Sequence, residues 1–295
     1  MNLKGKTAIV TGGGRDIGRA CVMRLAEEGA KVAINYHSSG AGAESAVAEI
    51  TAGGGEAFAL KGDMTDQVDV GRLVRETQSH FGEKIDVLIH VTGGLIARKK
   101  INEMDLEHWN RVMELNTTSL FMMVKAVEPH MPDGSAIVTF ASQAGRDGGG
   151  PGAVVYAASK GAVMTMTRGL AKELGPRVRV NSLCPGMIDT DFHNIFTKPE
   201  VRTHVANASP VKREGTSEDT ANLAVFLASD QSAFMTGACV DINGGTLFSW
   251  ARPWRGNAGP QAAGDGPSTA VRPSPAARRR GLRRAGGSAP CRLAI

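Results

Sequence analysis

Short segments rich in aliphatic and β-branched residues alternate with longer amphipathic segments over residues 1–246, and no other feature constrains the fold as strongly. The segments with the pattern of strands are 7–10, 31–35, 57–60, 87–91, 136–140, 177–183 and 239–242. Those with the pattern of helices are 17–28, 44–51, 68–80, 106–130, 153–174 and 217–228. This alternation predicts a single α/β domain, in which helices cover both faces of one doubly wound parallel sheet. Functional residues are therefore expected in the loops that follow the strands.

Residues 247–295 have a different composition, dominated by Arg, Pro, Ala and Gly without an apolar period. Such a segment buries too little apolar surface to offset its chain entropy, so we expect a disordered tail. It holds nine arginines and one acid and therefore carries a net charge of +8. Because the whole chain has a net charge of +5, residues 1–246 carry −3. The body therefore has no basic footprint for nucleic acid. The tail could be a nucleic-acid or membrane arm, an inert extension, or a product of cloning or a frameshift, and its composition favours the last two.

No segment approaches the roughly 18 to 20 consecutive apolar residues that span a bilayer, and the first residues do not have the pattern of a signal peptide. We therefore expect a cytoplasmic protein without a membrane partner. Neither a metal site nor a disulfide framework is expected, because the cysteines are scattered without a C-x-x-C pair: Cys21, Cys184, Cys239 and Cys291.

A glycine-rich turn follows the first expected strand, where the chain reads Thr11-Gly12-Gly13-Gly14-Arg15-Asp16-Ile17-Gly18. Glycines allow the backbone to approach a pyrophosphate, and the start of the following helix offers free N–H groups. A glycine-rich stretch alone is a weak signal, but this one lies between a strand and a helix of a βαβ unit. The sequence therefore predicts a Rossmann-type dinucleotide site.

The turn has the spacing T-G-x-x-x-G-x-G and resembles that of the classical short-chain dehydrogenases/reductases, except that Asp16 replaces the usual middle glycine. Asp tolerates unusual dihedral angles, so we expect the loop to keep its form. The resemblance covers residues 3–246. A second departure is His90-Val91-Thr92-Gly93, where the family usually has N-N-A-G, so the side-chain support of the sheet is expected to differ. The cofactor contacts implied by the resemblance are Gly12, Ile17, Gly18, Asp63, Met64, Thr92, Gly93, Pro185, Gly186, Ile188 and Thr190.

The choice between NAD and NADP is expected at the end of the second strand, where an acid would hold the ribose hydroxyls of NAD. The chain reads Asn35-Tyr36-His37-Ser38-Ser39 there, without an acid. Arg15, together with Ser38 or His37, could instead bind a 2′-phosphate, and Tyr36 is also expected to contact the cofactor. We therefore predict NADPH as the cofactor, with NADH as the alternative.

Tyr156 and Lys160 are four residues apart in an expected helix, which places them on one face. An ammonium near a phenol favours the phenolate and lowers its pKa, so the pair can transfer a proton. Ser142 follows the fifth strand, and Asn116 lies within an apolar helical stripe; either could be purely structural. The resemblance makes these four residues a catalytic tetrad. It implies that Tyr156 donates a proton, Lys160 binds the nicotinamide ribose, Ser142 orients the carbonyl, and Asn116 holds a water. A homotetramer is also implied.

Basic side chains are expected around the substrate: Arg98, Lys99 and Lys100 after the fourth strand, Arg146 before Tyr156, and His193 in a lid. They could form a solvated rim or steer an anionic substrate. The segments 93–99, 148–153 and 189–193 resemble a subgroup that reduces uronate-derived α-keto sugars such as 4-deoxy-L-erythro-5-hexoseulose uronate. A more general resemblance is to 3-oxoacyl-acyl-carrier-protein reductases. A non-catalytic dinucleotide sensor of this fold is a further alternative.

Overall fold

The computed structural model describes residues 3–249. Its centre is a parallel sheet with the strand order β3-β2-β1-β4-β5-β6-β7. The strands are β1 (Thr7–Thr11), β2 (Lys31–Tyr36), β3 (Ala57–Lys61), β4 (Val87–His90), β5 (Ser135–Phe140), β6 (Val178–Pro185) and β7 (Cys239–Ile242). The predicted doubly wound, Rossmann-type α/β fold is confirmed.

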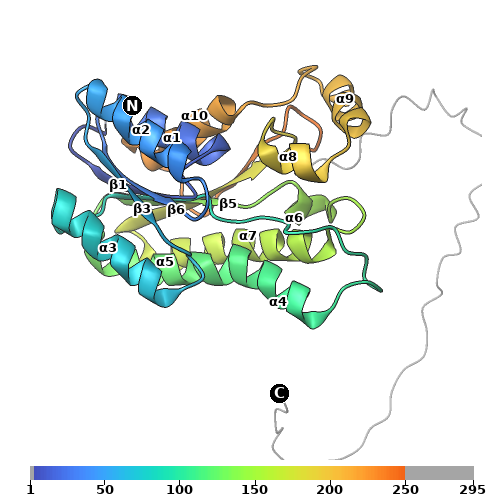
Figure 1. Ribbon diagram of the computed structural model, residues 1–295, viewed down its shortest axis with the longest axis horizontal. Helices are drawn as coiled ribbons and strands as arrows, with labels where there is room; N and C mark the ends of the chain where they lie inside the picture. Colours follow the sequence, from blue (N-terminus) through green and yellow to red (C-terminus); the bar gives the residue numbers. More distant parts are fainter. Residues whose placement is uncertain (1–2, 250–295) are drawn as a thin grey trace, which may run out of the picture. The chain divides into compact units, whose positions relative to one another are not determined.

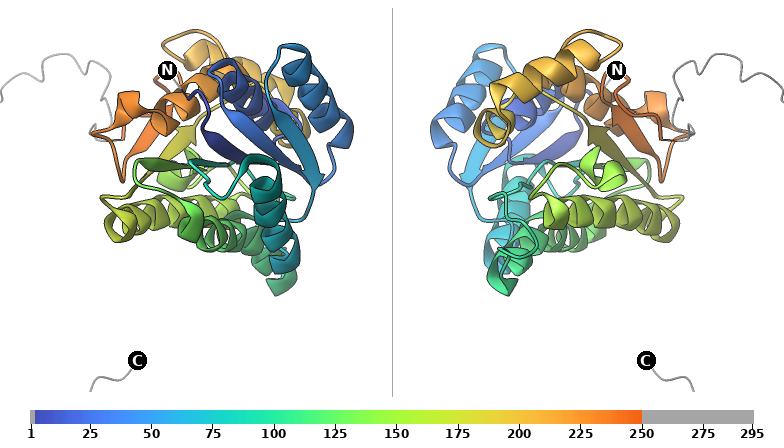
Figure 2. Two further views of the ribbon diagram at one scale, coloured as in Figure 1. Left: turned by 90° about the vertical axis from the view of Figure 1, so that its left-hand side faces the viewer. Right: turned by 90° about the vertical axis from the view of Figure 1, so that its right-hand side faces the viewer.

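Helices cover both faces of this sheet, as Figures 1 and 2 show. One layer contains α1 (Asp16–Glu27), α2 (Gly40–Ala52) and α10 (Ser217–Ala228); the other contains α3 (Gln67–Phe81), α4 (Leu106–Met113), α5 (Ser119–Val127) and α7 (Val154–Leu174). Each layer has its own apolar core against the sheet. The central strands β1, β4 and β5 are buried along their whole length, which explains their nearly continuous aliphatic sequences.

The expected helix 106–130 is interrupted. A π-helical turn (η1, Glu114–Thr118) separates α4 from α5, and a 3₁₀ turn (η2, Glu128–His130) follows α5. π-helical turns within α-helices are frequent at functional sites, and this one contains Asn116. Another 3₁₀ turn (η3, Asp230–Ser232) follows α10.

Three helices were not expected from the sequence: α6 (Ala144–Asp147), α8 (Asp191–Phe196) and α9 (Pro199–Ala208). All of them follow the carboxyl ends of strands β5 or β6. Contacts with the folded domain continue just beyond the predicted boundary at residue 246: Asn243, directly after β7, donates from Nδ2 to the Leu247 carbonyl at 2.9 Å. The rest of the predicted tail, 250–295, lies outside the described residues.

Candidate active site

A cavity of about 710 Å³ opens at the carboxyl ends of the strands, as expected for this fold. Its walls come from the loops after β1 to β6 and from α8 and α9. The predicted site residues that line it are Gly12, Arg15, Asp16, Ile17, Gly18, His37, Ser38, Asp63, Met64, Thr92, Gly93, Arg98, Ser142, Tyr156, Lys160, Pro185, Gly186, Ile188, Thr190 and His193.

The glycine-rich turn is packed too tightly for larger residues. A Cβ on Gly18 would overlap the carbonyl oxygen of Gly12, and one on Gly14 would overlap Ser39. Gly12 has φ +66° and Asp16 has φ +47°. Asp16 thus adopts the left-handed conformation, as expected at a position where the family usually has glycine. This close backbone at the start of α1 fits a dinucleotide pyrophosphate.

Asn35, at the end of β2, supports this turn and was not predicted as a site residue. It is buried, its Oδ1 accepts from the Gly12 N–H at 3.4 Å, and its Nδ2 donates to the Gly62 carbonyl at 3.0 Å. One amide thus joins the loops after β1 and β3. In the sequence, the one sign of this supporting role is that Asn35 stands two residues before His37, which was predicted to bind the cofactor.

The loop after β2 bears no carboxylate beside the cavity, where His37, Ser38 and Ser39 line the wall. Tyr36 is an exception to the prediction, because it does not line the cavity. Its ring instead packs at the start of α2, where a Cβ on Gly40 would lie 3.1 Å from it. Successive side chains of a strand point to opposite faces of the sheet. Tyr36, the last residue of β2, can therefore point away from the cavity although His37 lines it.

Tyr156 and Lys160 lie one turn apart on α7, with the Lys160 Nζ 5.7 Å from the centroid of the Tyr156 ring. Ser142, which follows β5, lies near enough to the Tyr156 hydroxyl to influence its pKa, and its Oγ accepts from the Ala144 N–H at 3.1 Å. Lys160 is buried and its Nζ donates to the Phe140 carbonyl at 2.8 Å. Burial lowers the pKa of Lys160 to about 8. These three side chains thus converge where β5 ends.

The pKa of Tyr156 is raised, whereas its spacing with Lys160 predicted that it would be lowered. Burial raises this pKa, and the nearby Ser142 hydroxyl opposes the shift. Loss of solvent destabilises the phenolate, and the Lys160 Nζ is directed to the Phe140 carbonyl. Tyr156 is therefore protonated at neutral pH.

Asn116 does not line the cavity but lies behind Gly93. Its Oδ1 accepts from the Gly94 N–H at 3.0 Å, while its Nδ2 donates to the carbonyls of Gly94 and Val112, both at 2.8 Å. A Cβ on Gly93 would lie 2.7 Å from Asn116 Oδ1 and 2.8 Å from Lys160 Nζ. Asn116 and Lys160 thus approach the same glycine, which has no room for a side chain.

His90 replaces the usual asparagine support, and its ring joins β4 to two other elements. Nδ1 lies 3.1 Å from Thr11 Oγ1 on β1, and Nε2 lies 3.2 Å from Ser119 Oγ on α5. Ser119 donates its hydroxyl to the Leu115 carbonyl, so its oxygen accepts from Nε2–H. Burial, reinforced by the charge of Lys160, lowers the pKa of His90 to about 3. The ring is therefore neutral.

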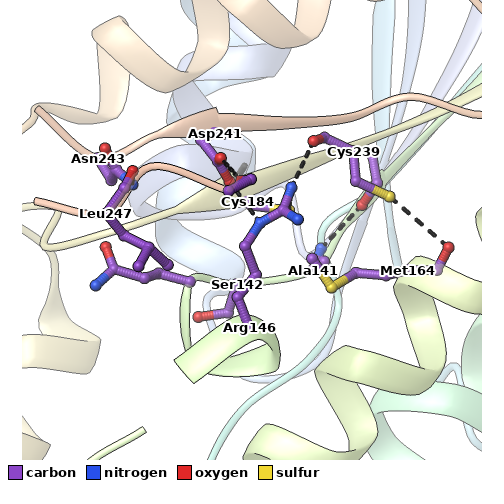
Figure 3. Close-up of polar contacts among 12 residues, drawn as sticks. Ala141, Ser142, Arg146, Met164, Cys184, Cys239, Asp241, Asn243 and Leu247 are labelled. Atoms are coloured by element: carbon purple, nitrogen blue, oxygen red, sulfur yellow. Dashed lines mark hydrogen bonds and ion pairs between the residues drawn. The ribbon is translucent and has the colours of Figure 1, made fainter. Parts of the chain in front are cut away.

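Arg146 does not belong to the substrate rim that was predicted. Its Nε donates to Asp241 Oδ1 at 2.6 Å and its Nη2 to the Cys239 carbonyl at 2.6 Å (Figure 3). The guanidinium therefore fastens α6 to β7 instead of entering the cavity. The short helix α6, which the sequence did not indicate, directs Arg146 back toward the sheet.

Arg98 and His193 do line the cavity, but both are engaged. Arg98 donates from Nε to the Phe196 carbonyl at 2.9 Å and from Nη1 to the Pro151 carbonyl at 3.0 Å. His193 Nδ1 is paired with Thr197 Oγ1 at 2.9 Å, and burial lowers the pKa of its ring to about 4. Lys99 and Lys100 do not line the cavity, and Lys99 forms an ion pair with Asp105.

Residues 3–249 contain no group of three or more His, Cys, Asp or Glu side chains that could hold a metal ion. No helix in the same residues is long and apolar enough to cross a membrane.

Comparisons with known proteins show the family of this chain. Residues 12–246 match the family described as enoyl-(acyl carrier protein) reductase. The chain is 35% identical over 243 residues to a 3-oxoacyl-[acyl-carrier-protein] reductase of Staphylococcus epidermidis, covering 81% of this chain and 98% of that protein. A short-chain dehydrogenase/reductase from Serratia marcescens has 35% identity and a TM-score of 0.78, over 83% of this chain and 99% of that one.

A blue fluorescent protein from a metagenomic library, solved in complex with NADPH, is also similar. It has 35% identity and a TM-score of 0.77, and the match covers 83% of this chain and 99% of that one. The chain belongs to the short-chain dehydrogenase/reductase family and is an NAD(P)-dependent oxidoreductase.

Proposed function

We propose that this enzyme reduces a carbonyl group to an alcohol with NADPH. The observation that carries the proposal is the convergence of the Tyr156 hydroxyl, the nearby Ser142 and the buried Lys160 at the end of β5, inside the cavity that the glycine-rich turn borders. When bound, the nicotinamide supplies the hydride for this reaction.

The chain's own residues supply the proton and the orientation. Ser142 and Tyr156 offer two hydroxyls to one carbonyl oxygen, which stabilises the negative charge that develops there. Tyr156 then gives its proton to that oxygen. Lys160 holds a positive charge behind the phenol at neutral pH, because its lowered pKa of about 8 is still above 7. Asn116 fixes the loop at Gly94 and thereby the wall beside Lys160.

The preference for NADPH rests on the lack of a carboxylate in the loop after β2, on the hydroxyls of Ser38 and Ser39 there, and on Arg15 in the loop after β1. Helix α2 begins at Gly40 without an acid in its first turn, so its N–H groups are favourable to a 2′-phosphate. Arg15 reaches across the cavity mouth to Asp191, with Nη1 3.3 Å from Oδ2. It can exchange this exposed ion pair for a phosphate at little cost.

Absorbance at 340 nm, followed with NADPH and then NADH against a panel of carbonyl compounds, tests the proposal. Arg15→Gln should raise KM for NADPH about tenfold and change KM for NADH much less, since only NADPH has the extra phosphate. Arg75→Gln, on an exposed face of α3, is the matched control. Equal effects of Arg15→Gln on both cofactors would contradict the assignment to NADPH. Binding of NADPH without turnover of any carbonyl would favour the sensor alternative.

A uronate-derived substrate was suggested by a basic rim and by the segments 93–99, 148–153 and 189–193. The rim gives it little support, because Arg146 is paired with Asp241, Lys99 is paired with Asp105, and His193 is neutral at pH 7. The resemblance of the segments is supported by an NADH-dependent reductase of alginate metabolism that is 34% identical, with a TM-score of 0.76. A 3-oxoacyl thioester fits the comparison with the Staphylococcus epidermidis reductase. A 5-keto uronate and an acetoacetyl thioester therefore both belong in the carbonyl panel.

We also propose that the chain works as a homotetramer. Leu106 on α4, Phe121 on α5 and Val154 on α7 are large apolar side chains exposed by half or more, on the helix layer opposite α1 and α2. Burial of these side chains against other copies would be favourable. Sedimentation velocity on the full chain measures the number of copies.

A further inference from the structure

An aromatic cluster covers the Tyr156 end of the cavity. The Phe192 ring lies 5.7 Å from that of Tyr156 and 5.1 Å from that of Phe196, centroid to centroid. Both phenylalanines belong to α8 and line the cavity. A molecule whose carbonyl reaches Tyr156 therefore lies against aromatic rings on this side.

The neighbouring side chains of α8 and α9 continue this apolar wall. Ile195 stands three residues after Phe192, and Val201 and Val205 are one turn apart on α9. All three line the cavity, although Ile195 is 65% and Val201 47% exposed. The protein itself leaves this apolar surface uncovered, so a ligand that covers it gains hydrophobic binding energy.

A further apolar contribution comes from the loop after β4, where Leu95 and Ile96 line the cavity. Ile96 has φ +66°, and the Ala97 N–H donates to the Leu95 carbonyl at 2.8 Å across it. This is a γ-turn with a β-branched residue in the left-handed region, a strained conformation. Strain of this kind persists where surrounding contacts fix it, and it is concentrated at ligand sites.

The charges around this end of the cavity do not favour an anion. Arg98 is directed to two carbonyl oxygens, and the Asp147 carboxylate lines the same cavity. Arg202 is paired with Asp189 and Glu214, both at 2.5 Å, and Arg15 is paired with Asp191 of α8 at 3.3 Å.

We propose that the substrates are uncharged ketones or aldehydes with a bulky apolar group, aryl or branched alkyl, that packs on Ile96, Phe192 and Phe196. This inference rests on the proposed carbonyl reduction and names its substrate class. In the reaction a hydride from NADPH forms the new C–H bond at the carbonyl carbon. Tyr156 protonates the oxygen, and NADP⁺ and the alcohol leave.

Two pairs of α-keto compounds separate charge from size. Ethyl benzoylformate is neutral and aromatic, and benzoylformate is its anion; ethyl pyruvate and pyruvate are the small counterparts. With NADPH oxidation as the readout, kcat/KM for ethyl benzoylformate should exceed that for benzoylformate and that for ethyl pyruvate by at least about tenfold.

Ile96→Ala and Phe192→Ala should each lower kcat/KM for ethyl benzoylformate about tenfold, mainly through KM, because they remove the surface on which the ring packs. Ethyl pyruvate should be affected much less. Ile101→Ala is the matched control: it lies in the same loop, is 71% exposed and does not line the cavity. NADPH affinity, measured by fluorescence titration, verifies that each variant keeps its cofactor site.

Three results would overturn the inference. Preference for benzoylformate, or for a 5-keto uronate, would show an anion site while leaving NADPH-dependent carbonyl reduction intact. Equal losses of kcat/KM for ethyl benzoylformate in Ile96→Ala and Ile101→Ala would show that the substrate does not pack on Ile96. No turnover of any compound, despite measured NADPH binding, would contradict the proposed function itself and the substrate class with it.

Discussion

His90 shows how one substituted residue changes the stability of this site. Its ring accepts from Thr11 and donates to Ser119 only in the neutral form, and its pKa falls from an ordinary 6.5 to about 3 on folding. The folded state therefore binds a proton less readily than the unfolded chain. The stability due to the neutral ring is complete above pH 6.5 and is lost progressively as the pH falls from 6.5 to about 3.

We predict that the free energy of unfolding decreases by about 2 kcal/mol between pH 7.5 and pH 5 through this ring alone. His90→Asn should be less stable at neutral pH but should lack this part of the pH dependence. Urea unfolding of both proteins at a series of pH values measures the difference, with His204→Asn, exposed on α9, as the control. Parallel pH profiles for the wild type and His90→Asn would contradict the assignment.

At the same scale, most residues predicted to contact the cofactor line the cavity, because they depend on backbone position after a strand, which the sequence pattern sets. Gly12, Gly18, Pro185 and Thr190 are examples. Arg146 could not be placed, because its direction depends on an ion pair with Asp241, 95 residues away. The raised pKa of Tyr156 was missed for a similar reason, since burial depends on packing that spacing alone does not describe.

Among the elements, strands with dense aliphatic sequence were predicted to within a few residues, whereas α8 and α9 were missed. These two helices bury no side chain fully, so their sequences lack the apolar stripe of a packed helix. Their apolar residues face the cavity. The π-helical turn at Asn116 was missed as well, because the side-chain bonds to Gly94 that accompany it are tertiary contacts.

Arg98 connects three of these elements: the loop after β4 that carries it, the end of α8 through Phe196, and the α6–α7 loop through Pro151. We predict that Arg98→Ala raises KM for the carbonyl substrate about fivefold to tenfold, because two charge-assisted hydrogen bonds that hold the apolar wall are lost. The dissociation constant of NADPH should change little. Lys100→Ala, in the same loop but not lining the cavity, is the control in steady-state kinetics. If Lys100→Ala weakened substrate binding as much, Arg98 would have no special role.

For the whole molecule, the parallel sheet explains why residues distant in sequence meet at one edge. The glycine-rich turn, Ser142, Tyr156 and Lys160 all lie at or beside the carboxyl ends of β1 and β5, which β4 separates. The fold places the glycine-rich turn and Tyr156 on one cavity, and α8 and α9, which follow β6, border it on the side where we propose that the substrate binds. The central claim is that this cavity transfers hydride to a carbonyl carbon while Tyr156 protonates its oxygen.

Deuterium transfer from NADPH labelled at the transferring C4 position tests that claim most directly. The wild-type protein, given ethyl benzoylformate, should produce ethyl mandelate heavier by one deuterium, as measured by mass spectrometry. Tyr156→Phe should retain NADPH binding but produce labelled alcohol at least about a hundredfold more slowly, because the proton donor is lost. Unlabelled alcohol, or undiminished production by Tyr156→Phe, would contradict the account.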